Sequence, residues 1–566
     1  MKPSPPAADL PAEANSRRSK AFAVLAMLLI AGTLAGQVFY FIVDRSDHIN
    51  GYEHQMLHGL LVAMGNTLME GFAPARHLNP YADNMLYLIT GGLVKLVGYR
   101  EWVLLMAPML GWALILWFGF RLAARLGGGK FAGWLAATAL ALTPFVYGLT
   151  RRFDAWPLTI GIFLGVAYYL TVYLEQPSLR GAAIVGAFAA AGAFTPGEGT
   201  PLILYIFYLS LPLGWAALRT LLDREQAPRD RVLRAGVMLA VAFIPMLFWL
   251  HHVHLLNGYY LGYLSAQGGS PDRAGWPWRY LVISSWETLG WIGAIFFFSL
   301  ALVFPLVHRG GPGRFWFAYV VVTYCVMSFI PKKNPWYILE ILALLPILAA
   351  VAVSALVRKL GRWAGGALVG VFLAGLVFQY AFFLFLPWLT WRGIRDQVQS
   401  RTFSVNPAAC VIDLSPQSYR SRIAIFRERF LNQFPRGKTV HLGLLAGGPG
   451  YEMATSYLRF SDHPPLLYDV LTRPLSEVCR LDAVVVIAGR AEMGLSFHQA
   501  DAAARYVQQY QQSLRRIFLL SPEKEAEMQR NARELIGLLH QARKLRLADG
   551  LDVYFPAEAC AQAPGA

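Results

Sequence analysis

The sequence predicts a polytopic α-helical membrane protein with about 11 spans, followed by a C-terminal extracytoplasmic α/β domain. Of its 566 residues, 56% are hydrophobic and 15% are charged, whereas soluble proteins have about 45–50% and about 25%. Apolar runs of roughly 20 residues, long enough to cross a hydrocarbon core of about 30 Å, recur between Ala21 and Leu389. This composition excludes a soluble or a disordered chain.

The distribution of apolar runs divides the chain into three regions. The N-terminal stretch is rich in Pro and Ala and is expected to be disordered, and the tail has no apolar run long enough to span. The regions are a cytoplasmic N-terminus at residues 1–20, a transmembrane domain at 21–390 with a long first outer loop at 44–100, and a soluble domain at 391–566.

The first apolar run, Ala21–Val43, is predicted to be a retained anchor with a cytoplasmic N-terminus. It follows a basic stretch and is too long for a cleaved signal peptide. If successive spans cross the membrane in alternate directions from this anchor, nearly every basic connection, such as Arg358–Arg362, lies on the cytoplasmic side. This holds when Tyr81–Val97 lies at the outer interface and does not span. The other spans are expected at about residues 101–122, 131–149, 155–175, 181–195, 200–218, 235–255, 286–307, 314–330, 336–356 and 366–390.

The net charge of +16 is explained by these basic connections, because basic residues in short loops set membrane topology. The sequence therefore predicts membrane lipids as partners and no nucleic acid. The same topology predicts that the protein lies in the plasma membrane, which is the inner membrane if the cell is bacterial. Its C-terminal domain is expected in the periplasm or outside the cell.

Acidic residues follow the first span directly, in the segment Asp47-His-Ile-Asn-Gly-Tyr-Glu53-His54. Charges at the mouth of a membrane helix are costly unless they are solvated, paired or functional. Solvated loop charges and catalytic acids are both consistent with this segment. His54 and His58 also have the i, i+4 spacing of metal ligands, so a divalent metal is an alternative cofactor, although no HExxH pattern is present.

Further charged residues lie at other outer helix ends, where topology alone does not explain them. Arg151 and Arg152 run against the positive-inside bias, so their anionic partner is either Asp154 or a ligand phosphate. Glu198 is flanked by glycines after a proline, and such backbone must line a cavity or pack against protein. A third group consists of two lysines and two aromatic residues, Lys332, Lys333, Trp336 and Tyr337. Either anchoring at the membrane interface or binding of a polyprenyl phosphate head group would explain it.

Together these residues place carboxylates and cations on one face of the membrane. A carboxylate can accept the proton of an attacking hydroxyl, and fixed cations can stabilise a departing phosphate. The arrangement is suited to a reaction on a substrate linked to a lipid phosphate.

The motifs resemble those of the GT-C superfamily of integral membrane glycosyltransferases, over about residues 20–350. The branches that they resemble are the protein O-mannosyltransferases and the lipid A aminoarabinose transferases. The matching elements are the acidic first loop (Asp47–His54), Lys95-Leu-Val-Gly98, Arg152-Phe-Asp154 and Lys333-Asn-Pro-Trp336-Tyr337. Two elements depart from the pattern: Asn50-Gly51 stands where many relatives have Asp-Glu, and Asn79-Pro80 replaces Pro-Pro.

The resemblance implies an inverting glycosyltransferase that takes a sugar from a polyprenyl-phosphate donor. The acceptor would be a hydroxyl of a lipid, protein or glycan at the outer face. Asp47 or Glu53 would be the general base, and Asp154 would share the cleft and position the sugar or a metal. The substrate-binding residues would be His54, Arg151, Arg152, Glu198, Lys332, Lys333, Trp336 and Tyr337. A lipid-linked substrate transporter and a non-catalytic subunit with the same fold are the alternatives.

The tail alternates strand-like and helix-like runs, which predicts a small α/β domain. A bridge between Cys410 and Cys479 is one expectation for an oxidising compartment, and free buried thiols are the other. Gly447-Gly-Pro-Gly450 is interpreted as a plain turn. Strands are expected at Ala409–Asp413, Thr439–Leu445, Asp482–Ala488 and Leu551–Phe555, and helices at Ala500–Gln512 and Glu523–Leu545.

Overall fold

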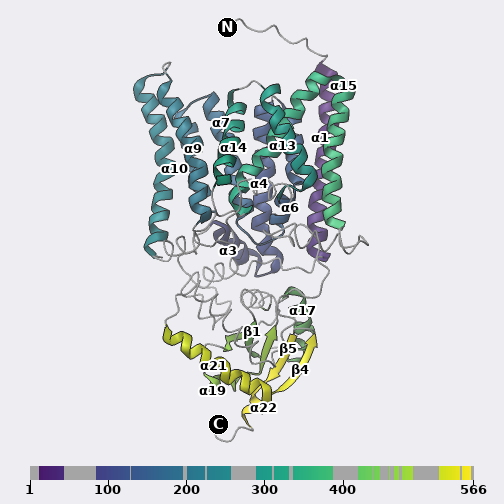
Figure 1. Cartoon of the computed structure of the whole chain (residues 1–566), viewed down its shortest axis with the longest axis vertical. Coiled ribbons are helices and arrows are strands. Elements are labelled where there is room, and N and C mark those ends of the chain that lie inside the picture. Colours follow the sequence, from purple (N-terminus) through teal and green to yellow (C-terminus); the bar gives the residue numbers. More distant parts are fainter. Residues whose placement is uncertain are drawn as a thin grey trace. The chain divides into compact units, whose positions relative to one another are not determined.

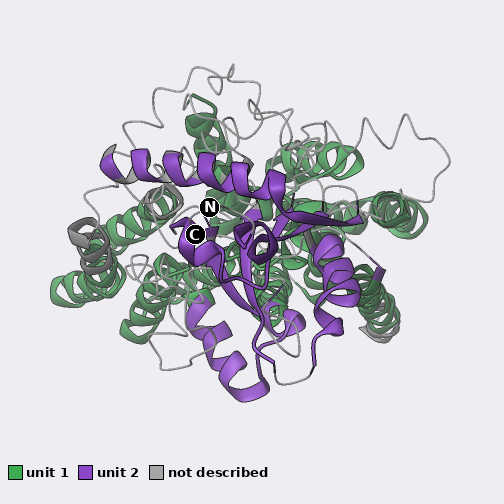
Figure 2. Cartoon of the chain, turned by 90° about the horizontal axis from the view of Figure 1, so that it is seen from below, with its two compact units in different colours: residues 1–42, 84–86, 105–412 green, residues 43–83, 87–104, 413–566 purple. Residues whose placement is uncertain are grey.

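The structure is a computed structural model. It forms two compact units, coloured separately in Figure 2 and described here one at a time: unit 1 is residues 1–42, 84–86 and 105–412, and unit 2 is residues 43–83, 87–104 and 413–566. The described residues are 12–43, 85–127, 129–195, 200–223, 226–256, 288–308, 311–329, 335–385, 419–435, 438–446, 458, 465–470, 474–487, 522–548 and 551–561.

Unit 1 is a bundle of helices (Figure 1), and each of the predicted spans coincides with a helical segment. Within the described residues, five helices are long and apolar enough to cross a membrane, and there are six such spans if the bent pair α5 and α6, with an angle of 61°, is counted as one. The span count of about 11 therefore stays a prediction. The helices are α1 (Ala12–Val43), α4 (Glu101–Gly127), α5 (Lys130–Ala141), α6 (Pro144–Thr150), α7 (Trp156–Glu175), α8 (Leu179–Ala193), α9 (Thr200–Leu222), α10 (Pro228–Leu256), α13 (Trp291–Val307), α14 (Gly311–Phe329), η5 (Pro335–Ile338) and α15 (Leu339–Phe385).

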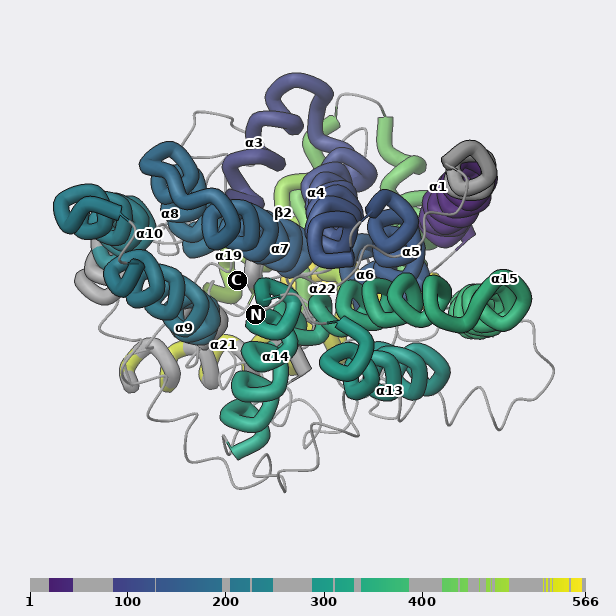
Figure 3. Tube along the Cα trace, turned by 90° about the horizontal axis from the view of Figure 1, so that it is seen from above, coloured from purple at the N-terminus to yellow at the C-terminus, as the bar shows by residue number. Residues whose placement is uncertain are grey.

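Helix α15 supplies the centre of this bundle, because its first half is apolar on every side and buried throughout. It packs between α5 and α13, while α8, α9 and α10 lie together on the other side of the bundle (Figure 3). Gly361 has φ +76°, a left-handed conformation that glycine adopts readily, and it breaks α15 into two helices. The break lies inside the predicted basic connection Arg358–Arg362, so two helical segments are present there as expected.

Unit 2 contains a five-stranded mixed sheet with the order β2-β1-β3-β5-β4. Strand β1 is parallel to β2 and β3, whereas β5 is antiparallel to β3 and β4. The predicted α/β character of the tail is present. The elements are α3 (Met85–Val97), shared with unit 1, and α17 (Tyr419–Arg429), η8 (Leu431–Gln433), β1 (His441–Ala446), β2 (Leu466–Asp469), α19 (Leu475–Val478), β3 (Ala483–Ile487), α21 (Pro522–Gln541), β4 (Arg543–Ala548), β5 (Leu551–Phe555) and α22 (Pro556–Cys560).

Two expectations for the tail are wrong. The helix predicted over Glu523–Leu545 ends at Gln541, and the residues after it form β4, because pairing with β5 overrides their local helix propensity. Strand β2 was not predicted, since four residues carry too little periodicity to be recognised. The predicted strand Ala409–Asp413, the predicted helix Ala500–Gln512 and the turn at 447–450 lie outside the described residues.

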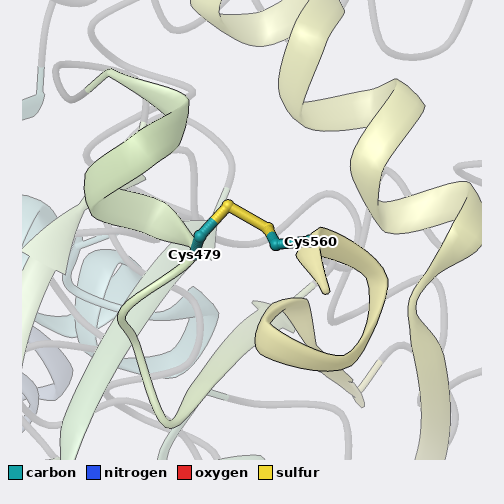
Figure 4. The surroundings of a disulfide bond; sticks show 2 residues. All are labelled: Cys479 and Cys560. Carbon is teal, nitrogen blue, oxygen red and sulfur yellow. A yellow bond between two sulfur atoms is a disulfide. The ribbon is translucent and has the colours of Figure 1, made fainter. Parts of the chain in front are cut away.

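Cys479 forms a disulfide with Cys560 (Figure 4). The pairing with Cys410 and the free-thiol alternative for Cys479 are therefore both wrong. The sheet explains the observed pairing. Strands β3 and β5 are antiparallel, with Val484 opposite Tyr554, so the residues just before β3 lie beside those just after β5. Cys479 and Cys560 occupy these positions, with their Cα atoms 5.9 Å apart.

Candidate functional site

The turn between α6 and α7 holds Arg151, whose side chain is 3% exposed. Its Nε donates a hydrogen bond of 2.7 Å to Oε1 of Gln37 on α1. Its guanidinium lies 4.0 Å from the ring centre of Tyr40 and 4.9 Å from that of Tyr147, distances at which cation–π attraction is appreciable. Protein groups of two helices therefore surround the charge of Arg151, for which the sequence analysis left Asp154 and a ligand phosphate as possible anionic partners.

Gln37 connects this arginine to the rest of the turn. Its Nε2 donates to the carbonyl of Tyr147 at 3.2 Å and to Oγ1 of Thr150 at 3.1 Å. Tyr380 of α15 packs edge-on against Tyr147 with the ring centres 4.9 Å apart, and its hydroxyl donates to the carbonyl of Thr33. The network fixes the α6–α7 turn against α1 and the end of α15.

Arg152 has a different environment from its neighbour. Its Nε and Nη1 are buried, and no described residue accepts a hydrogen bond from them. Buried N–H groups of an arginine are strong donors, and an anion at this place would satisfy them. Arg152 therefore has two buried donors that could bind a phosphate, whereas Nε of Arg151 is bonded to Gln37 and its guanidinium lies against two tyrosine rings.

Asp154 follows in the same turn and is 6% exposed. Burial raises the pKa of Asp154 from 3.8 to about 6, while the charge of Arg152 and the backbone N–H groups of Trp156 and Ala155 lower it and so limit the rise. The Trp156 N–H donates to Oδ1 at 3.2 Å. A buried carboxyl that titrates near neutral pH, beside an arginine, has the environment typical of functional acids.

Tyr337 is buried in η5, and its carbonyl accepts a hydrogen bond from the hydroxyl of Tyr208 on α9. This bond joins Tyr337, and with it η5, to α9. The remaining predicted site residues lie outside the described residues, as does the side chain of Trp336; they are Asp47, Glu53, His54, Glu198, Lys332 and Lys333. Among the described residues, no three His, Cys, Asp or Glu side chains form a group that could hold a metal ion.

Glu340 and Tyr205 are buried polar residues of unit 1 that the sequence analysis did not single out, and Gln37 is another. Glu340 begins α15 and is 2% exposed, and Tyr205 of α9 is fully buried. The signal was available for Glu340, since an acidic residue three positions after Tyr337, inside an apolar run, is expensive in a membrane and is by default a candidate for function.

Comparison with known proteins gives a match only at the level of structure. No family model matches the sequence, and no curated protein matches it. Solved structures do match, and all of those described below share less than 15% of their residues with this chain.

The overall fold is similar to that of ArnT, which is the kind of fold that the sequence motifs predicted. The crystal structure of ArnT from Cupriavidus metallidurans in the apo state is similar with a TM-score of 0.55 and 14% identity, covering 95% of this chain and 99% of that chain. The same ArnT bound to undecaprenyl phosphate is similar with a TM-score of 0.55 and 14% identity, covering 94% and 97%. An oligosaccharyltransferase from Archaeoglobus fulgidus has a TM-score of 0.46 and 12% identity, covering 88% and 72%.

Proposed function

We propose that the protein is an inverting glycosyltransferase that moves a sugar from a polyprenyl-phosphate donor to an acceptor hydroxyl at the outer face of the membrane. The observation that carries the proposal is the pair of buried Arg152 N–H groups without a protein acceptor among the described residues, next to the buried carboxyl of Asp154. The fold adds support, because ArnT has been solved with undecaprenyl phosphate bound.

In this proposal Arg152 binds the donor phosphate, with Lys332 and Lys333 as further cations and Trp336 and Tyr337 beside the lipid. Fixed positive charge stabilises the phosphate most when the bond to the sugar breaks and the charge on the leaving group grows. Arg151 does not bind the phosphate itself in this proposal. It positions Arg152, because its hydrogen bond to Gln37 holds the turn that carries both arginines.

The reaction is a single displacement. The acceptor oxygen bonds to the anomeric carbon, the bond from that carbon to the phosphate oxygen breaks, and the lipid phosphate leaves with the electron pair. A carboxylate of the first loop, Asp47 or Glu53, takes the proton of the acceptor hydroxyl, with His54 and Glu198 near the substrate. Asp154 positions the sugar, or a divalent metal if one is used.

The disulfide supports an outer location for the C-terminal domain. Disulfides persist in oxidising compartments and are rare in the cytosol, and Cys479–Cys560 joins two elements of this domain. The basic connections of the sequence predict the same orientation, since they place the N-terminus in the cytoplasm and the chain after the last span outside.

The test is turnover of radiolabelled undecaprenyl-phosphate sugars by the purified protein in lipid nanodiscs. Arg152→Gln and Asp154→Asn are each expected to lower donor turnover by at least about 100-fold. Arg125→Gln is the matched control, because Arg125 pairs with Glu175 in a partly exposed ion pair of 2.5 Å; it should retain wild-type turnover. Absence of turnover with every donor, together with release of bound lipid across the bilayer, would indicate a transporter instead.

A further inference from the structure

Among the buried polar groups of unit 1 that lack a hydrogen-bond partner within the described residues, two belong to neighbouring side chains. They are Oε2 of Glu340 at the start of α15 and the hydroxyl of Tyr205 on α9. Both side chains are at least nine-tenths buried. The carboxyl of Glu340 is also close enough to interact electrostatically with Tyr205 and with Tyr319 on α14.

The neighbouring tyrosine hydroxyls are all engaged. Tyr319 donates to the carbonyl of Tyr208 at 3.0 Å, and Tyr208 donates to the carbonyl of Tyr337. These bonds fasten α14 to α9 and α9 to η5. The hydroxyls of Tyr319 and Tyr208 are therefore satisfied by backbone carbonyls, whereas the Tyr205 hydroxyl and Oε2 of Glu340 have no partner among the described residues.

Such a pair is unfavourable for a protein that binds nothing there. Buried polar groups in native proteins are nearly always hydrogen-bonded, and one without a partner keeps the full cost of its desolvation. The surroundings nevertheless accommodate the pair: Gly192 of α8 leaves room for the Tyr205 hydroxyl, which a Cβ at this position would contact too closely. Two adjacent unsatisfied groups thus point to a ligand that supplies the missing partners.

The position of the pair relates it to the proposed donor site. Residues three apart on a helix lie on the same face. Glu340 follows Tyr337 by three residues, and Tyr205 precedes Tyr208 by three, so each member of the pair shares a face with one of these two tyrosines. Tyr208 and Tyr337 are themselves hydrogen-bonded. The pair therefore lies close to Tyr337, which the proposed function places beside the donor lipid.

We propose that Glu340 and Tyr205 bind the sugar ring of the lipid-phosphate donor and set its specificity. The carboxyl of Glu340 accepts a hydrogen bond from one sugar hydroxyl, and the hydroxyl of Tyr205 donates to a second sugar oxygen. A site that hydrogen-bonds substrate hydroxyls rejects analogues without them strongly, because its own buried groups are then left unpaired. This inference rests on the proposed function, since it assigns the sugar of that donor.

The experiment compares binding of two kinds of lipid by the full-length protein in nanodiscs. One probe is undecaprenyl phosphate, and the others are undecaprenyl phosphates that carry a hexose, a pentose or an amino sugar. Glu340→Gln and Tyr205→Phe are the variants. Tyr173→Phe is the control, because the Tyr173 hydroxyl is also buried but is hydrogen-bonded to Thr220 at 2.8 Å.

We expect Glu340→Gln and Tyr205→Phe to lower at least tenfold the affinity for the sugar-bearing lipid that the wild type binds best. The affinity for undecaprenyl phosphate should not change. Tyr205→Phe should also raise Tm without ligand, since it removes an unsatisfied hydroxyl, whereas Tyr173→Phe should lower Tm and leave both affinities unchanged. Equal effects on both kinds of lipid, no effect on either, or a wild type that prefers no sugar-bearing lipid would each overturn the inference. A wild type that binds no undecaprenyl phosphate would instead overturn the proposed function.

Discussion

The Nε of Arg151 donates a 2.7 Å hydrogen bond to Oε1 of Gln37, 114 residues earlier in the chain. This bond brings α1 against the α6–α7 turn and separates the roles of two adjacent arginines. Arg151 is enclosed by Gln37, Tyr40 and Tyr147, while Arg152 keeps two buried N–H groups without a described acceptor.

Arg151→Met is therefore expected to affect stability more than donor binding. The change breaks a buried charge-assisted hydrogen bond and leaves Oε1 of Gln37 without that donor, a loss of about 1–3 kcal/mol in the free energy of unfolding. Arg152→Gln should do the reverse: it should weaken the binding of undecaprenyl phosphate and change Tm less than Arg151→Met does. Thermal unfolding and lipid binding measured on both variants check this, and the opposite pattern would exchange the two roles.

Asp154 predicts a specific dependence of stability on pH. Its pKa in the folded protein is about 6, above 3.8, so between these values the folded state binds more protons than the unfolded state. The stability contributed by this group is present in full below about pH 4, falls as pH rises to about 6, and is then constant at a loss of about 3 kcal/mol. Asp154→Asn removes this dependence.

The measurement is the difference in Tm between Asp154→Asn and wild type from pH 4 to pH 8. The Tm of the variant minus that of the wild type should increase as the pH rises to about 6 and stay constant above it. A difference that is constant over the whole range would show that Asp154 does not titrate there.

Arg152 is expected to set the pH at which Asp154 ionises. Its positive charge lowers the pKa of Asp154, so Arg152→Gln should raise that pKa and Arg152→Lys should restore it in part, because lysine keeps the charge. The checked quantity is the midpoint of the pH-dependent change in Tm. An identical midpoint in Arg152→Gln and Arg152→Lys would exclude an electrostatic link.

The disulfide should contribute substantially to the stability of the C-terminal domain. Cys479 and Cys560 are 81 residues apart, and closing a loop of this length stabilises a domain by about 4 kcal/mol. Replacing both cysteines by serine should lower the unfolding temperature of this domain, and dithiothreitol should act on the wild type only. Mass spectrometry of the unreduced protein should recover the Cys479–Cys560 peptide, and recovery of a Cys410 peptide in its place would contradict the assignment.

Within unit 2, Arg420 of α17 makes an ion pair with Glu101 at the start of α4, with Nε 3.0 Å from Oε1. Nη2 lies 3.4 Å from Oε2, so the contact is forked and partly buried. A double-mutant cycle of Arg420→Gln and Glu101→Gln should give a coupling energy of about 1 kcal/mol, above the median for exposed pairs. A cycle with no coupling would show that each residue acts through its other contacts.

The helical segments of unit 1 could be predicted from the sequence alone, including the connection Arg358–Arg362 that separates the two halves of α15, because apolar length and basic connections are local properties. The sequence also identified Arg151, Arg152 and Asp154 as residues that topology does not explain. Four features became known from the packing of the elements: the enclosure of Arg151 by α1 and α6, the pairing of Cys479 with Cys560, the strand after Gln541, and the burial of Glu340 beside Tyr205. Each of these depends on segments distant in the chain that meet only when the helices and strands pack, and the local pattern of residues does not contain that information.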